Sequence, residues 1–255
     1  MNASARPASL EDIRPWRDLF RQEMNCQITK DSIHSRPGWT REYQLFVGDV
    51  AVGYGSLAVA GPWKEKPTAY EFFVMPPWRN RTFDLFEAFL AESGAVAIEH
   101  QSNGGLLSVM IHAYARGVET EAIVFHDRIT THHPAPDGAV FRPERPDERP
   151  EEADGVPGWE FVLDVGGAVA ARGGVLWHYN RPYGDIFMEV AESHRRRGLG
   201  TYLVQEMKRV TYERGGVPAA RCNPGNVASR RTLQKAGFVP CGHILTGTVA
   251  LTSSR

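Results

Sequence analysis

A basic turn with two glycines, His194-Arg195-Arg196-Arg197-Gly198-Leu199-Gly200-Thr201, lies between a short apolar run and a stretch of helical periodicity. The glycines therefore fall where a strand becomes a helix. The first backbone N–H groups of a helix have no intrahelical partner and lie at the positive end of its dipole, so they bind phosphate oxygens. Gly198 and Gly200 leave room for a ligand, and the three arginines add positive charge. The spacing predicts a diphosphate-binding site.

A second polar segment follows in the chain from Asn226 to Phe238. It contains an Asn that can cap a helix, a short helical stretch and a glycine suited to a helix C-terminus. The turn alone matches neither the Gly-x-Gly-x-x-Gly of dinucleotide folds nor the Gly-x-x-x-x-Gly-Lys of nucleotide triphosphatases. Together, the two segments resemble the GNAT superfamily of acetyl-CoA-dependent N-acyltransferases. Arg195-x-x-Gly198-x-Gly200 is similar to its pyrophosphate loop, and Asn226-x-x-Ser229 with Lys235-Ala236-Gly237-Phe238 is similar to its later helix and closing strand.

The resemblance covers residues 160 to 250 and implies that acetyl-CoA binds as cosubstrate in a gap between two strands that splay apart. The strand that ends at Val190 would offer backbone N–H groups to the thioester carbonyl and the pantetheine arm, as a small oxyanion hole. Ser229 would face the cosubstrate, and Arg230 or Arg231 would reach its nucleotide phosphate. The residues expected to bind acetyl-CoA are Met188, Val190, Arg195, Arg196, Arg197, Gly198, Leu199, Gly200, Thr201, Asn226, Ser229 and Arg231.

Direct attack by an amine on the thioester requires a base that removes a proton from the ammonium group. Glu189 is the leading candidate, because a carboxylate on the central strand beside the loop can act directly or through a water. Asp185 and Glu192 are the alternatives. The alternative for Glu189 is a structural role, either as a surface carboxylate at the end of the strand or as the partner of an arginine.

The sulfur of CoA departs either as a thiol, with a proton supplied by an acid, or as a thiolate, if the pKa of the thiol is low enough. Many members of the superfamily carry a tyrosine five residues before the Phe of the Gly-Phe pair, where this chain has Leu233. Ser229, Cys222, Tyr202 or solvent remain, and we take Ser229 with Glu189 as the candidate catalytic pair. A thiol with a pKa of about 8.5 leaves as thiolate with little help at neutral pH.

The first half of the chain has the same order of elements as the second. A capped amphipathic helix is expected over residues 9–24, and a hairpin over 43–47 and 50–59 around Gly48-Asp49. An offset of 116 residues aligns the halves, and places Arg79 on Arg195 and Arg81 on Arg197. It also places Thr82 on Gly198 and Asp84 on Gly200. A threonine and a carboxylate at these positions would crowd and repel a diphosphate, so the first copy is expected not to bind CoA.

The sequence predicts two GNAT-like domains of α/β (α+β) class, each a mixed, mostly antiparallel sheet flanked by helices. Residues 1–135 form a degenerate domain with a structural or acceptor-shaping role, and 136–255 form the acetyltransferase domain. The boundary falls in a Pro-rich, charged connection over 132–158. In the superfamily that the chain resembles, helices at this position help to wall the acceptor site, whereas the second copy has only a charged, Pro-rich connection between Arg142 and Trp159. The resemblance therefore implies that its acceptor pocket is completed by the first domain or by another subunit.

Composition narrows the range of partners. The 255 residues carry a formal net charge of -1, which does not favour nucleic acid or an anionic membrane as partner. No apolar run is long enough to span a membrane and the N-terminus has no signal-peptide pattern. Three cysteines and the adjacent His132-His133 form no metal-ligand pattern, so no metal is expected. The protein is expected to be cytoplasmic and a monomer or homodimer.

The predicted function is transfer of the acetyl group of acetyl-CoA to a primary amine, most simply that of a small molecule. The alternative is a non-catalytic acyl-CoA-binding or interaction protein of the same fold. Gly198 and Gly200 favour retained cosubstrate binding, whereas Leu233 at the tyrosine position favours the alternative.

Overall fold

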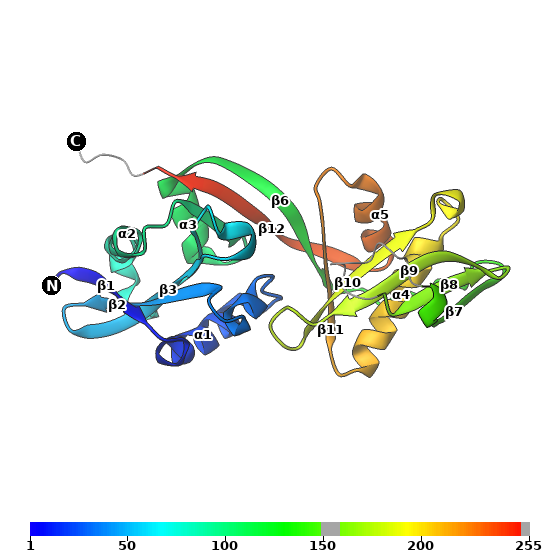
Figure 1. Cartoon of the computed structure of the whole chain (residues 1–255), viewed down its shortest axis with the longest axis horizontal. Coiled ribbons are helices and arrows are strands. Elements are labelled where there is room, and N and C mark those ends of the chain that lie inside the picture. The colour runs from blue at the N-terminus through cyan, green and yellow to red at the C-terminus, as the bar shows by residue number, and fades with distance from the viewer. Residues whose placement is uncertain (149–158, 251–255) are drawn as a thin grey trace. The chain divides into compact units, whose positions relative to one another are not determined.

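A computed structural model describes residues 1–148 and 159–250 of the chain. These residues form two compact units (Figure 1). Unit 1 comprises Met1–Ala122 together with the chain from Gly242 onward, and unit 2 comprises Ile123–Cys241. None of the described helices is long and apolar enough to cross a membrane.

Unit 1 is a sheet with helices, in the strand order β1-β2-β3-β4-β5-β12. Neighbouring strands are antiparallel except β4 and β5, which are parallel. Its elements along the chain are β1 (Ala3–Ala8), α1 (Leu10–Met24), η1 (Asp31–Ser35), β2 (Thr40–Val47), β3 (Val50–Ala58), η2 (Gly61–Trp63), β4 (Thr68–Val74), η3 (Pro76–Arg81), α2 (Thr82–Ser93), β5 (Ala97–Gln101) and α3 (Gly105–Tyr114).

Unit 2 has the strand order β6-β11-β10-β9-β8-β7, and here β10 and β11 are the parallel pair. Its elements are β7 (Ala139–Pro143), η4 (Pro146–Glu148), β8 (Phe161–Val165), β9 (Ala168–Leu176), β10 (Tyr183–Val190), η5 (Glu192–His194), α4 (Leu199–Glu213), β11 (Val217–Cys222) and α5 (Val227–Lys235). The expected connection between Arg142 and Trp159 lies partly outside the described residues.

Two long strands, β6 (Ala115–Asp127) and β12 (Phe238–Val249), begin in one unit and end in the other. The second half of β6 pairs with β11 in unit 2, and the second half of β12 pairs with β5 in unit 1. The compact units therefore differ from the expected division at residue 135. Each unit takes its last strand from the other half of the chain, which no single cut in the sequence can describe.

The local elements follow the sequence pattern closely. Ser9 and Asp12 form a reciprocal capping box at the start of α1, which satisfies N–H groups that the helix itself leaves unpaired. The β2–β3 hairpin turns at Gly48, whose φ of 61° suits a tight turn. Both expectations, the helix over 9–24 and the hairpin, are confirmed.

In each unit the parallel strand pair is short and then opens. β10 pairs with β11 from Tyr183 to Asp185, and β4 pairs with β5 at Thr68 and Ala69. The pairing of β10 with β11 ends at Asp185, whereas the other edge of β10 continues to pair with β9 up to Val190. This opening lies beside α4, whose apolar side packs on the sheet through Leu199, Leu203 and Met207.

Candidate functional site

A groove of about 660 Å³ in unit 2 runs along β10, the η5–α4 turn and α5. Eleven of the twelve residues expected to bind acetyl-CoA line it: Met188, Val190, Arg195, Arg196, Gly198, Leu199, Gly200, Thr201, Asn226, Ser229 and Arg231. Arg197 is exposed and is not among the lining residues. His194, Ala228, Thr232 and Lys235 line the groove as well and were not predicted. The sequence signal for the last three was their spacing along the helix.

The turn before α4 has the backbone shape of an anion site. Gly198 is the N-cap at φ 81°, a left-handed conformation that favours glycine, and no described side chain caps the helix. A Cβ added at Gly200 would lie 3.3 Å from Val190 Cγ2 and 3.4 Å from Thr232 Cγ2. The first N–H groups of α4 are thus left for a ligand, and a side chain at Gly200 would press on Val190 and Thr232 beside them.

The arginines of the turn have different roles. Arg195 donates from Nε to the carbonyl of Val190 at 3.2 Å, which braces the turn against the end of β10. Arg196, at a φ of 62°, and Arg197 form no ion pair within the described parts of the chain. Their positive charge is therefore not neutralised by a carboxylate and raises the local potential for an anion.

On α5, Asn226 and Ser229 lie at the N-terminal end. Asn226 Oδ1 accepts from the Ser229 N–H at 3.0 Å, so this side chain serves as helix cap. Burial raises the pKa of Cys222, although the Arg230 charge and a hydrogen bond with Ser229 oppose the shift. A raised thiol pKa argues against Cys222 as a nucleophile. Of the acid candidates, Ser229 lines the groove, whereas Tyr202 packs against the core and Leu233 is buried in it.

Glu189 is the candidate base that the structure places in the groove. It is exposed and pairs across the sheet with Arg172, the natural partner for its charge. The Arg172 guanidinium, however, donates to Glu144 Oε1 at 2.8 Å and to the Glu148 carbonyl at 2.5 Å. Among the residues that the structure describes, Glu189 has no ion-pair partner, so its carboxylate stays unneutralised at the groove.

The two alternative carboxylates lie elsewhere. Asp185 is buried, 3.1 Å from His178 Nε2 and 3.5 Å from Arg221 Nε, and does not line the groove. Glu192 belongs to η5 and is not a lining residue either. Among the described residues, no group of three or more His, Cys, Asp or Glu side chains could hold a metal ion.

Unit 1 repeats the plan of the turn but fills it with its own side chains. Arg79 donates from Nε to the carbonyl of Val74 at 3.0 Å, the counterpart of the Arg195–Val190 bond at the offset of 116. Arg81 pairs with Asp84 at 2.6 Å, and Thr82 Oγ1 donates to the Arg79 carbonyl at 2.7 Å. Arginines at the turn of unit 1 are thus paired with carboxylates of the same unit, Arg79 with Glu23 and Arg81 with Asp84.

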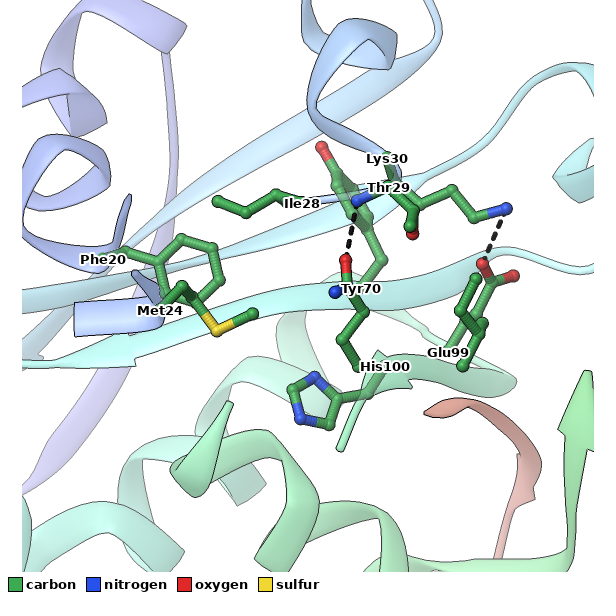
Figure 2. Close-up of a pocket in the computed structure, with 10 residues that line it drawn as sticks. Phe20, Met24, Ile28, Thr29, Lys30, Tyr70, Glu99 and His100 are labelled. Carbon is green, nitrogen blue, oxygen red and sulfur yellow. Dashed lines mark hydrogen bonds and ion pairs between the residues drawn. The ribbon is translucent and has the colours of Figure 1, made fainter. Parts of the chain in front are cut away.

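Two cavities of unit 1 are small. One of about 70 Å³ lies between Phe72 and Phe73 of β4 and the start of α3, where unit 2 has its groove. The other, of about 20 Å³, has room for about one water molecule (Figure 2). Its polar groups are paired: Lys30 Nζ lies 3.0 Å from Glu99 Oε1, and the Thr29 N–H donates to Gln101 Oε1 at 2.6 Å.

A buried cluster of charged side chains lies where α1 and η1 meet β4. Arg17 donates to both carboxylate oxygens of Glu71, at 3.0 and 3.2 Å, and His34 lies 3.1 Å from Glu71 and 3.0 Å from Glu42. Although burial opposes the charge, Glu71 and the hydrogen bonds with Glu42 and Glu71 raise the pKa of His34 to about 9. His34 is thus protonated in the folded unit at neutral pH.

This cluster makes the stability of unit 1 pH-dependent. The unfolded imidazole has a pKa of about 6.5, so its contribution is complete below that pH and is lost as the pH rises through 9. We expect the free energy of unfolding to fall by about 3 kcal/mol between pH 6.5 and 9.5 in urea titrations of the full chain. Tyr54 and Tyr70 do not titrate in this window, because burial raises their pKa well above 10. His34→Gln should remove most of the slope, and an unchanged slope would contradict the assignment.

Solved structures match the chain over its whole length. An acetyltransferase from GNAT family from Colwellia psychrerythraea is 12% identical, with a TM-score of 0.75 over 97% of this chain and 100% of that one. A GCN5-related N-acetyltransferase from Sphaerobacter thermophilus is 17% identical (TM-score 0.63; 96% and 95%). A tandem GNAT protein from the clavulanic acid biosynthesis pathway is 16% identical (TM-score 0.62; 100% and 100%).

The chain therefore has the GNAT acetyltransferase fold in a tandem arrangement, as its sequence predicted. Residues 170–243 match the family model described as FR47-like protein. The matched segment runs from β9 to β12 and includes the groove residues of unit 2. No curated protein sequence matches the chain.

Proposed function

We propose that unit 2 is an N-acetyltransferase that binds acetyl-CoA in its groove and transfers the acetyl group to a primary amine of a small molecule. The observation that carries the proposal is the open groove that ends at the uncapped, arginine-rich N-terminus of α4. The α4 N–H groups and Arg195 and Arg196 would hold the diphosphate. Unit 1, with cavities of about 70 and 20 Å³, would bind no cosubstrate.

The thioester would lie along the edge of β10 beyond the point where its pairing with β11 ends. Backbone N–H groups of Met188 and Val190 are the expected donors to the carbonyl and the pantetheine arm, and donors held by a strand need no rearrangement during the reaction. Side chains alternate along β10, so Ile186 packs toward α4, whereas Phe187 and Glu189 point to the opposite face. The amine would approach from that face, where Phe187 contacts the ring of Trp159 at 5.0 Å.

Glu189 would accept the proton of the ammonium group, directly or through a water, before the amine attacks the carbonyl carbon. The thiolate would then leave, and Ser229 is the acid candidate that lines the groove. A non-catalytic acyl-CoA-binding protein is the second candidate, and the observation that favours it is Leu233, buried where many relatives of this fold carry the tyrosine.

Calorimetric titration of acetyl-CoA into the full chain, followed by thiol release with a panel of primary amines, tests the proposal. One equivalent bound and thiol release that depends on the amine are expected. Binding without release from any amine would favour the non-catalytic candidate. No binding would refute both candidates, and two equivalents would contradict the assignment of unit 1.

A further inference from the structure

Two aromatic side chains lie together on the face of the unit 2 sheet that is opposite α4. Phe187 points to this face of β10, and the centroid of its ring lies 5.0 Å from that of Trp159, with an angle of 43° between the ring planes. Both side chains are half-buried. Trp159 and Phe187, the aromatic pair, therefore offer a partly open apolar surface to a small molecule.

The backbone of β9 positions both rings. Gly174 is the cross-strand partner of Phe187, and a Cβ added at Gly174 would lie 2.8 Å from Cε1 and Cζ of the Phe187 ring. The ring thus lies against the β9 backbone, where a larger residue would displace it. The N–H of Glu160 donates to the Gly173 carbonyl at 3.1 Å, which holds the chain next to Trp159 on the same strand.

Glu189 follows Phe187 on the same face, two residues further along β10. Side chains two residues apart on a strand are about 7 Å from each other. An ammonium group at the Glu189 carboxylate would therefore place its carbon skeleton against the aromatic pair. The carboxylate and the negative faces of the rings both favour a cation at this place.

The arginines of the two neighbouring strands already face carboxylates. Arg172 of β9 donates to Glu144 Oε1 at 2.8 Å, and Nε of Arg221 on β11 lies 3.5 Å from Asp185 Oδ2. A carboxylate on the acceptor would have to compete with Glu144 or Asp185, and a second ammonium group would have to compete with Arg221. The face therefore matches an amine with one positive charge and no negative charge.

Resting on the proposed function, we propose that the acceptor of unit 2 is a small aromatic primary amine, with its ammonium group at Glu189 and its ring against Phe187 and Trp159. The aromatic pair selects the acceptor, and Glu189 accepts its proton. Amino acids add a carboxylate to the amine and diamines add a second ammonium group, so both classes are poor acceptors.

Thiol release by the full chain at saturating acetyl-CoA tests the inference, with 2-phenylethylamine, propylamine, free phenylalanine and 1,4-diaminobutane as probes. We expect kcat/KM for 2-phenylethylamine to exceed that for propylamine about tenfold or more, because its phenyl ring leaves water on binding. Free phenylalanine carries the same ring with a carboxylate, and 1,4-diaminobutane carries a second cation. Each should be poorer than 2-phenylethylamine by about tenfold or more.

In Trp159→Ala/Phe187→Leu, kcat/KM for 2-phenylethylamine should fall to that for propylamine, mainly through a higher KM. The kcat/KM for propylamine and the dissociation constant of acetyl-CoA should stay at their wild-type values. A loss of aromatic packing that merely destabilised the fold would lower the activity with both amines, so the ratio separates selection of the acceptor from a structural role.

Trp177→Ala/Phe161→Leu is the matched control, because it makes the same two changes elsewhere in unit 2. Trp177 lies against Gly216, and Phe161 stacks on Phe141 with ring centroids 5.1 Å apart. This control should keep the wild-type preference for 2-phenylethylamine.

Three results would overturn the inference and leave the proposed function intact. These are equal kcat/KM for 2-phenylethylamine and propylamine in the wild type, faster turnover of free phenylalanine or 1,4-diaminobutane than of 2-phenylethylamine, and a preference that survives in Trp159→Ala/Phe187→Leu. Thiol release with other amines but with none of these four would overturn it as well. No release with any amine would refute the proposed transfer and the inference with it.

Discussion

Acetyl-CoA is expected not to bind measurably to the variant Gly198→Asp/Gly200→Asp, a loss of at least about 100-fold in affinity. Gly198 has a φ of 81°, a backbone conformation that is strained for any residue with a side chain. At Gly200, an added Cβ would lie only 3.3 Å from Val190 and 3.4 Å from Thr232. Two carboxylates at the positive end of α4 would also repel the diphosphate. Calorimetric titration of acetyl-CoA measures the effect.

The matched control is Gly138→Asp/Gly166→Asp. Both glycines lie in unit 2 outside the groove, both have positive φ, at 69° and 64°, and a Cβ at either meets nothing within 4 Å. The control adds the same charge and a similar backbone strain, so it should bind acetyl-CoA like the wild type. Wild-type affinity in the groove variant would show that the diphosphate does not bind at this turn.

Removal of the proposed base should give the second large effect. Glu189→Gln keeps the shape of the side chain but cannot accept a proton, so kcat should fall about 10²- to 10⁴-fold. The dissociation constant of acetyl-CoA should change little, because the diphosphate and pantetheine contacts come from other residues. Thiol release at saturating acetyl-CoA gives kcat, and calorimetry gives the binding constant, so a folding defect and a chemical defect are separated.

Glu192→Gln is the control for this prediction, since it removes an exposed carboxylate three residues further along that does not line the groove. Its kcat should match the wild type. Full activity of Glu189→Gln would contradict the assignment of Glu189 as the base. The next candidate would be Asp185, the last residue of β10 that pairs with β11. Asp185→Asn would then be the variant to measure, and it would also remove the carboxylate that faces His178 and Arg221.

Local features of this protein were determined by its sequence alone. The capping box of Ser9 and Asp12 and the turn at Gly48 involve residues a few positions apart, so their energies are decided within one short segment. The offset of 116 residues was readable for the same reason, because each copy has an arginine five residues after the last valine of its central strand. In the structure both arginines donate to the carbonyl of that valine. The composition of the groove followed from that turn and from the helix after Asn226.

Tertiary structure decided which strands pair and which charges remain available. The second half of β6 pairs with β11 in unit 2 and the second half of β12 pairs with β5 in unit 1, although each strand begins in the other unit. Arg172 could pair with Glu189 across the sheet, yet Glu144 and Glu148, which are distant in the chain, hold it instead. Arg17 and Glu71 meet over 54 residues to close the face of β4. Such contacts depend on the folded positions of distant segments, whereas caps and turns depend on the residues beside them.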